Sequence, residues 1–258
     1  MEEVLFNGQA GRLEGRYYKS PRANAPVALI LHPDPTYGGT MNNKVVYTLF
    51  RCFQDLGFSV LRFNFRGVGR SQGVFNNGIG ELSDATVALD WLQNMNPDAK
   101  QCWVAGHSFG AWIGLQLLMR RPDINNFIAV TPPTNEKDFS FLAPCPASGL
   151  IIQGGRDEFV PPEMVENMAR RLNMQRNADI DFAMIEEADH KYSGHLPDLY
   201  KISGQYVISA MQQRSPTKKR RGRRKKSDMD DDMLLENDET ETQDGFEDEN
   251  YSDMEDED

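Results

Sequence analysis

Gly106-His107-Ser108-Phe109-Gly110 is the stretch of sequence that decides the fold of this chain. It lies between an apolar run at 102–105 and a run with helical character at 111–118. A Gly-x-Ser-x-Gly sequence between a strand and a helix predicts a nucleophile elbow, a tight turn whose flanking glycines avoid Cβ clashes. We therefore expect Ser108 to be a nucleophile. The backbone amide of Phe109, at the start of the helix, is expected to stabilise an oxyanion.

A serine hydroxyl needs a base to take its proton, and that base needs an acid to orient it. The chain has four histidines, His32, His107, His190 and His195. Where an elbow of this kind occurs, the acid and then the histidine follow the serine along the chain, which leaves His190 and His195. We favour His190 because it comes soon after the strand expected over 180–185, where a loop can carry it over the serine.

The acid is expected at the end of the preceding strand. The apolar run 150–153 leads into two glycines and then into Asp157. Glu158 is the neighbouring alternative, and Asp138, which lies one strand earlier, is another. The position of Asp157 directly after the strand makes it the favoured acid.

A second oxyanion donor is expected in the loop 32–39, which follows another apolar run. The two prolines of this loop have no N–H to donate. The backbone amide of Asp34 is the first choice, and the amides of Thr36 and Tyr37 are the alternatives.

These motifs together resemble the α/β-hydrolase superfamily, and within it a branch of small bacterial hydrolases related to the serine aminopeptidase and dienelactone hydrolase groups. The resemblance spans residues 1–213 and rests on the segments 32–41, 62–71, 106–111, Asp157 and 188–190. It implies a catalytic triad of Ser108, Asp157 and His190. Pro33 departs from the pattern, since many relatives have glycine there.

Apolar runs typical of strands alternate with helical runs along the first 213 residues. This alternation predicts an α/β fold with a mostly parallel sheet and helices on both faces. Strands are expected at 13–18, 27–31, 59–65, 101–105, 126–130, 150–153 and 180–185, and helices at 43–56, 83–95, 111–120, 162–173 and 196–211. Only a short stretch separates the strands near Val130 and Leu150, so no large lid is expected.

The glycine-rich segment 66–73 follows a strand, as the dinucleotide-binding fingerprint does. Gln72 stands in place of the third glycine, and no helix begins directly afterwards. We therefore expect a shaped loop there and no dinucleotide site.

Three cysteines, Cys52, Cys102 and Cys145, are odd in number and lie far apart, which argues against a disulfide framework or a metal site. No metal or other cofactor is expected. The chain shows no signal peptide and no apolar run of about 18 residues, so we expect no membrane span and a cytoplasmic location.

The composition changes after residue 213. Residues 214–226 carry nine Lys/Arg and no acid, whereas 227–258 carry seventeen Asp/Glu and no Lys/Arg. Such blocks cannot bury enough apolar surface to fold, so we expect a hydrolase domain over 1–213 and a disordered tail over 214–258. The basic block is a candidate for weak contact with nucleic acid or another anionic surface.

The function expected from the sequence is cleavage of a small carboxylic ester or thioester by a serine hydrolase, through an acyl-enzyme. One alternative is a serine peptidase of the aminopeptidase kind, in which Glu158, Glu186 or Glu187 would receive the substrate amine. The other is a non-enzymatic binding protein that works through its charged tail.

Overall fold

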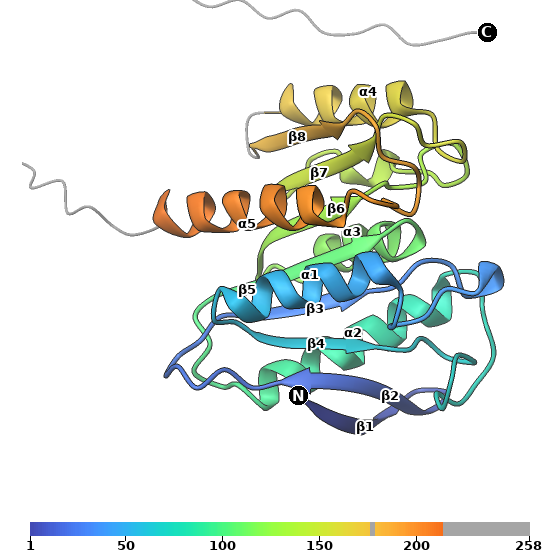
Figure 1. Cartoon of the computed structure of the whole chain (residues 1–258). Helices are drawn as coiled ribbons and strands as arrows, with labels where there is room; N and C mark the ends of the chain where they lie inside the picture. The colour runs from blue at the N-terminus through green and yellow to red at the C-terminus, as the bar shows by residue number, and fades with distance from the viewer. Residues whose placement is uncertain (176–178, 214–258) are drawn as a thin grey trace, which may run out of the picture. The chain divides into compact units, whose positions relative to one another are not determined.

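The computed structural model describes residues 1–175 and 179–213 (Figure 1). The charged blocks on which the tail prediction rests lie outside these residues. The strands are β1 (Glu2–Gly8), β2 (Gly11–Tyr18), β3 (Val27–Leu31), β4 (Ser59–Phe63), β5 (Cys102–His107), β6 (Ile124–Val130), β7 (Ser148–Gly154) and β8 (Ile180–Ile185). The helices are α1 (Lys44–Asp55), α2 (Ile79–Asn94), α3 (Phe109–Arg120), α4 (Pro162–Asn173) and α5 (Leu196–Gln213), with short 3-10 turns η1 (Pro35–Tyr37) and η2 (Ser140–Leu142).

The described strands form one sheet in the order β1-β2-β4-β3-β5-β6-β7-β8. β1 and β2 pair antiparallel, as do β2 and β4, and every later pairing is parallel. The expected mostly parallel α/β sheet is confirmed. The sequence prediction missed β1, an edge strand that opens with the exposed Glu2 and Glu3 and lacks the apolar run of an internal strand.

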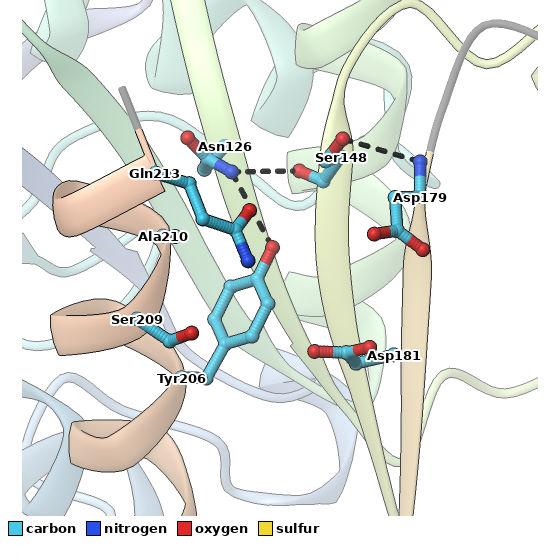
Figure 2. Close-up of a pocket in the computed structure, with 8 residues that line it drawn as sticks. All are labelled: Asn126, Ser148, Asp179, Asp181, Tyr206, Ser209, Ala210 and Gln213. Atoms are coloured by element: carbon cyan, nitrogen blue, oxygen red, sulfur yellow. Dashed lines mark hydrogen bonds between the residues drawn. The ribbon is translucent and has the colours of Figure 1, made fainter. Parts of the chain in front are cut away.

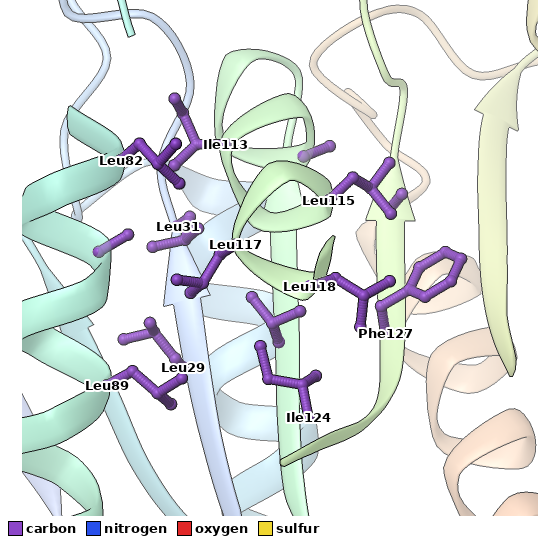
Figure 3. Packing of buried hydrophobic residues seen from close by; sticks show 14 of the residues in the cluster. Leu29, Leu31, Leu82, Leu89, Ile113, Leu115, Leu117, Leu118, Ile124 and Phe127 are labelled. Atoms are coloured by element: carbon purple, nitrogen blue, oxygen red, sulfur yellow. The ribbon is translucent and has the colours of Figure 1, made fainter. Parts of the chain in front are cut away.

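Helices cover both faces of the sheet and bury two apolar clusters. α1 and α5 pack on one face, in front of the sheet in Figure 1, and α2, α3 and α4 pack on the other. Figure 3 shows part of the cluster on the face covered by α2, α3 and α4, in which Leu29 and Leu31 of β3 lie between side chains of α2 and α3. β3 and β5 are buried along their whole length, which explains why each reads as a continuous apolar run.

α2 begins earlier than the sequence predicted, at Ile79 instead of Ser83. Gly78 caps the helix with a φ of 98°, and the Glu81 carboxylate accepts hydrogen bonds from the amides of Asn76 and Gly78. Those bonds supply acceptors for amides that a helix start would otherwise leave unpaired. The connection from β6 to β7 contains only η2, so the expectation of no large lid is confirmed.

The glycine-rich segment 66–73 is held by a buried ion pair. Asp84 of α2 is fully buried and accepts hydrogen bonds from the backbone amide and the guanidinium of Arg66, at 2.7 to 3.0 Å. A buried carboxylate stays charged only while such partners remain. The segment is therefore a shaped loop anchored to α2, as the sequence indicated.

Replacement of Asp84 by asparagine should lower the free energy of unfolding by about 3 kcal/mol, because Arg66 is left largely buried without its counter-ion. Urea denaturation measures the loss. Asp90→Asn is the matched control, since Asp90 lies on the same helix in a half-exposed pair with Arg121. The two variants should differ clearly, and equal losses would contradict the role given to Asp84.

Candidate functional site

Ser108 occupies a strained turn between β5 and α3. Its φ of 53° and ψ of −119° are unusual for a residue with a side chain, and strain of this kind concentrates at functional sites. Its amide donates to the Val130 carbonyl at 2.9 Å. A Cβ on Gly106 would lie 2.3 Å from the Gly110 carbonyl, and one on Gly110 would lie 2.5 Å from the Leu31 carbonyl. Both glycines are therefore required by close backbone contact.

The loop after β3 lies beside the first turn of α3, because Gly110 touches the carbonyls of Leu31 and His32. His32 is fully buried and organises this loop. Its Nε2 accepts from the Phe65 amide at 3.0 Å, which leaves Nδ1–H to donate to the Pro33 carbonyl at 2.7 Å. The two bonds together require the neutral imidazole, because Nε2 can accept only when it carries no proton.

The backbone amides of this loop differ in whether they already have a hydrogen-bond acceptor. The Thr36 amide donates to the Asp34 carboxylate at 2.7 Å, and the Tyr37 amide donates to the Asp34 carbonyl at 3.2 Å. The Asp34 amide has no acceptor in the part of the chain that the structure describes. Of the three amides considered from the sequence, Asp34 is the one left available.

Asp157 and His190 are brought together at the ends of β7 and β8. Asp157 Oδ2 accepts from His190 Nδ1 at 2.8 Å, and Oδ1 accepts from the amides of Phe159 and Val160 at 2.9 Å. Burial works against the charged carboxylate, but these hydrogen bonds outweigh it and lower the pKa of Asp157. The carboxylate thus stays charged and holds the imidazole in one orientation.

His107, which precedes the serine, connects the elbow to the His190 loop. It is buried, and its Nε2–H donates to the His190 carbonyl at 3.0 Å, with the two rings 5.1 Å apart. Tyr192 fixes the same loop from the other side, through hydroxyl bonds to Thr131 at 2.9 Å and to the Ile152 carbonyl at 3.3 Å. Among the described residues, no hydrogen bond joins the Ser108 hydroxyl to His190 directly.

Three of the alternatives weighed from the sequence are engaged with other residues, whereas Glu158 and Glu186 are exposed and form no ion pair within the described part of the chain. His195 pairs with Asp198 at the start of α5. Asp138 accepts from the amide and hydroxyl of Ser140 and so caps η2. Glu187 pairs with Arg156.

Burial also keeps two histidines neutral. It lowers the pKa of His32 to about 4 and that of His107 to about 3. Nδ1 of His107 has no partner within the described residues, so a second ring proton there would have no acceptor. The sequence did not single out His107 or Tyr192 as supports of the site, nor Gln153, whose side-chain amide donates to Asp157 Oδ2 at 3.4 Å and to the Val160 carbonyl at 3.2 Å. Only the position of His107 inside the elbow motif offered a signal.

Within residues 1–175 and 179–213, no group of three or more His, Cys, Asp or Glu side chains is arranged to hold a metal ion. The three cysteines are buried as free thiols. None of the described helices combines the length and the apolar character needed to cross a membrane.

A small polar pocket of about 80 Å³ lies away from these residues (Figure 2). It is lined from the amino-terminal halves of β6, β7 and β8 and from the end of α5. Asn126 bridges it by donating to the Ser148 carbonyl and the Tyr206 hydroxyl, both at 3.3 Å. Because Ser108, Asp157 and His190 follow the carboxyl ends of their strands, this pocket is separate from the candidate site.

Comparison with known proteins supports the same family. The model of the alpha/beta hydrolase fold family matches residues 35–144. An uncharacterized protein of Rickettsia prowazekii is 51% identical over 213 residues, which cover 81% of this chain and 90% of that protein. A lysophosphatidylserine lipase of Danio rerio is 32% identical over 108 residues, or 42% of this chain and 27% of the lipase.

Two solved structures are similar over most of their length. A protein of unknown function from Agrobacterium tumefaciens, assigned to the α/β-hydrolases, is 52% identical with a TM-score of 0.80, covering 83% of this chain and 98% of that one. A lidless α/β serine hydrolase from Xanthomonas campestris is 31% identical with a TM-score of 0.72, covering 81% of this chain and 94% of that one.

The buried histidines predict a pH dependence of stability. Their folded pKa values lie below the ordinary value of 6.5, so the unfolded chain binds more protons between about pH 4 and 6.5, and stability falls as the pH drops through this window. Lowering the pH from 6.5 to 5 should cost about 2 kcal/mol for each of His32 and His107. Asp157, whose pKa is lowered, loses its contribution only below its ordinary value near 4.

Urea denaturation at several pH values tests this dependence. In His107→Gln, the loss of unfolding free energy on lowering the pH should be smaller by the contribution of one histidine. A slope that is the same in wild type and His107→Gln would contradict the assignment.

Proposed function

This chain belongs to the α/β-hydrolase family, and on that premise we propose that it is a serine hydrolase that cleaves a small carboxylic ester or thioester. The observation that carries the proposal is the hydrogen-bonded pair of Asp157 and His190, whose loop is tied through His107 to the strained turn at Ser108. The residues proposed as nucleophile, base and acid thus follow three separate strand ends at one edge of the sheet.

In the proposed reaction His190 takes the proton of Ser108 as the hydroxyl attacks the acyl carbon. Asp157 accepts from Nδ1–H, so Nε2 is the nitrogen free to act as the base. The charged carboxylate also stabilises the imidazolium that forms. The bond between the serine and the histidine is expected to tighten when substrate binds, as catalytic hydrogen bonds often do.

Negative charge then develops on the substrate oxygen, and two backbone amides are proposed to receive it. The Phe109 amide is the first of α3, so it has no acceptor within the helix. The Asp34 amide faces no competing acceptor among the described residues, and the His32 bonds hold its loop in place. Donors fixed before the reaction stabilise the oxyanion without reorganisation.

His190 next returns its proton to the leaving group, and later activates the water that releases the acyl group. The lipase relative supports an acyl ester as substrate, since its name describes that class of reaction for the lipase. An aminopeptidase would require a carboxylate free to bind an amine. Glu187 is already paired with Arg156, whereas Glu158 and Glu186 form no ion pair among the described residues. Ester or thioester hydrolysis is placed first on the support of the lipase relative.

Fluorophosphonate labelling tests the nucleophile. The wild-type chain should be labelled and should hydrolyse short 4-nitrophenyl esters, whereas Ser108→Ala should lose both without a change in melting temperature. Ser209→Ala, on the exposed face of α5, is the control and should behave as wild type. Full labelling of Ser108→Ala would refute the proposed nucleophile.

The choice of base is tested by a pair of histidine variants. His190→Ala should lower kcat by about 10³-fold or more, because triad residues act as a unit. His195→Ala should change it little, since His195 is engaged by Asp198. The reverse order of effects, measured on the same ester, would mean that His195 is the base.

A further inference from the structure

A groove of about 390 Å³ lies between the β6–β7 connection and α4. Its apolar lining includes Leu142, Met168 and Leu172. Two cationic side chains also line it, the half-buried Lys137 from the connection and the exposed Arg171 from α4. The groove therefore joins apolar surface to positive charge.

The two segments that line the groove follow the ends of β6 and β7, at the edge of the sheet that carries the candidate site. The β6–β7 connection continues from Val130, whose carbonyl accepts from the Ser108 amide, and α4 follows Asp157 along the chain. Asn135 joins the two walls by donating to the Phe159 carbonyl at 2.9 Å. The Phe159 ring in turn lies 5.3 Å from the His190 ring, so this end of the walls is next to the proposed base.

Lys137 lies against the first turn of the helix that begins at the elbow. Its Nζ is 5.1 Å from the centre of the Trp112 ring and 6.0 Å from that of Phe109. Contacts of this kind position an ammonium group and leave its remaining N–H donors free. The charge is thus held beside the side chains of the first turn of α3, the turn that follows Ser108 in the chain.

The groove lining also includes one carboxylate, Asp138, which accepts from Ser140 and keeps its negative charge, so the two cations leave a net positive charge. Both ends of the Gln175 amide are bonded, to the Cys145 amide and to the Leu142 carbonyl. In contrast, neither Lys137 nor Arg171 forms an ion pair within residues 1–175 and 179–213. The groove therefore has positive charge available for a ligand.

We propose that this groove binds the anionic end of the substrate, and that Lys137, assisted by Arg171, selects esters that carry a carboxylate or phosphate group. The inference rests on the proposed function, since it names the substrate class of the same site. The apolar lining would bury methylene groups, and the half-buried ammonium would attract the charge more strongly than a fully exposed lysine. The anion is attached either to the acyl chain or to the alcohol.

Matched ester pairs test the proposal and distinguish these two sources. The first pair is the 4-nitrophenyl monoester of adipic acid and its ω-methyl ester, which differ in charge on the acyl side. The second pair is the butyrate ester of 4-hydroxybenzoate and that of its methyl ester, which differ in charge on the alcohol side. The readout is the ratio of kcat/KM for the anionic to the neutral ester, compared between wild type and variants so that intrinsic reactivity cancels.

In Lys137→Met this ratio should fall by about tenfold for one of the pairs, the size expected for loss of a charged hydrogen bond. Lys137→Arg should largely retain it. Arg170→Met is the matched control and should leave it unchanged, because Arg170 pairs with Glu166 and does not line the groove. The wild-type ratio should also decrease as salt is added. A ratio that is the same in wild type and Lys137→Met for both pairs overturns the proposal.

Failure of the groove and failure of the proposed function have different signatures. If the neutral esters are cleaved and Ser108 is labelled but the ratios do not respond to Lys137, only the groove proposal fails. If no ester is cleaved and no labelling occurs, the proposed function fails. Calorimetric titration with hexanoate and hexanamide then decides on the groove alone: hexanoate should bind about tenfold more tightly in wild type and not in Lys137→Met, and equal binding in wild type overturns it.

Discussion

Direct backbone contact at the start of α3 is the constraint on which the rest of the site depends. The helix begins immediately after β5, and its first turn touches the carbonyls at the end of β3 through Gly110. This contact forces Ser108 into its strained conformation and brings the Phe109 amide beside the loop that contains Asp34. A side chain at either elbow glycine would separate these elements, because the atoms it would meet belong to the backbone and have no rotamer to adopt.

Around this contact, the site relies on neutral histidines as well as charged groups. His32 and His107 are fully buried and donate to backbone carbonyls, and burial lowers the pKa of both. A neutral imidazole can hold a loop without the cost of burying a charge. Asp157 carries the charge that the proposed chemistry requires. It is buried, but it accepts hydrogen bonds from two amides and from His190. The supporting histidines thus fix positions while they stay uncharged.

Because there is no large lid, selection of a substrate depends on the connections at the edge of the sheet that carries the candidate site. The β6–β7 connection and the start of α4 both leave strands whose ends supply the candidate site, so a change in either alters what lies next to Ser108. Parallel α/β sheets commonly bind ligands at this edge, where the connections are free to vary. Lys137 belongs to the β6–β7 connection and Arg171 to the last turn of α4, whereas Asp157 and His190 are joined to each other after the ends of β7 and β8.

Much of the fold was determined by sequence that is local in the chain. The strand Val27–Leu31, the helix Pro162–Asn173 and the strand Ile180–Ile185 have the bounds expected from apolar runs and helical spacing. The elbow could also be predicted from the sequence, because its glycines, its serine and the flanking apolar and helical runs are adjacent in the chain. β1 could not be predicted in this way, since an edge strand with exposed acids has no continuous apolar run.

Tertiary structure decided the relations between residues that are distant in the chain. The sequence favoured His190 over His195 as the base, but only the packing of β8 beside β7 brought His190 to Asp157, while His195 joined the start of α5. The sequence likewise put the Asp34 amide ahead of those of Thr36 and Tyr37 as the second oxyanion donor, and the folded loop engages the latter two. The bond from His107 to the His190 carbonyl spans 83 residues. Short-range periodicity determines elements because neighbouring residues share one helix or strand. Contacts over such separations depend instead on how whole elements pack against one another.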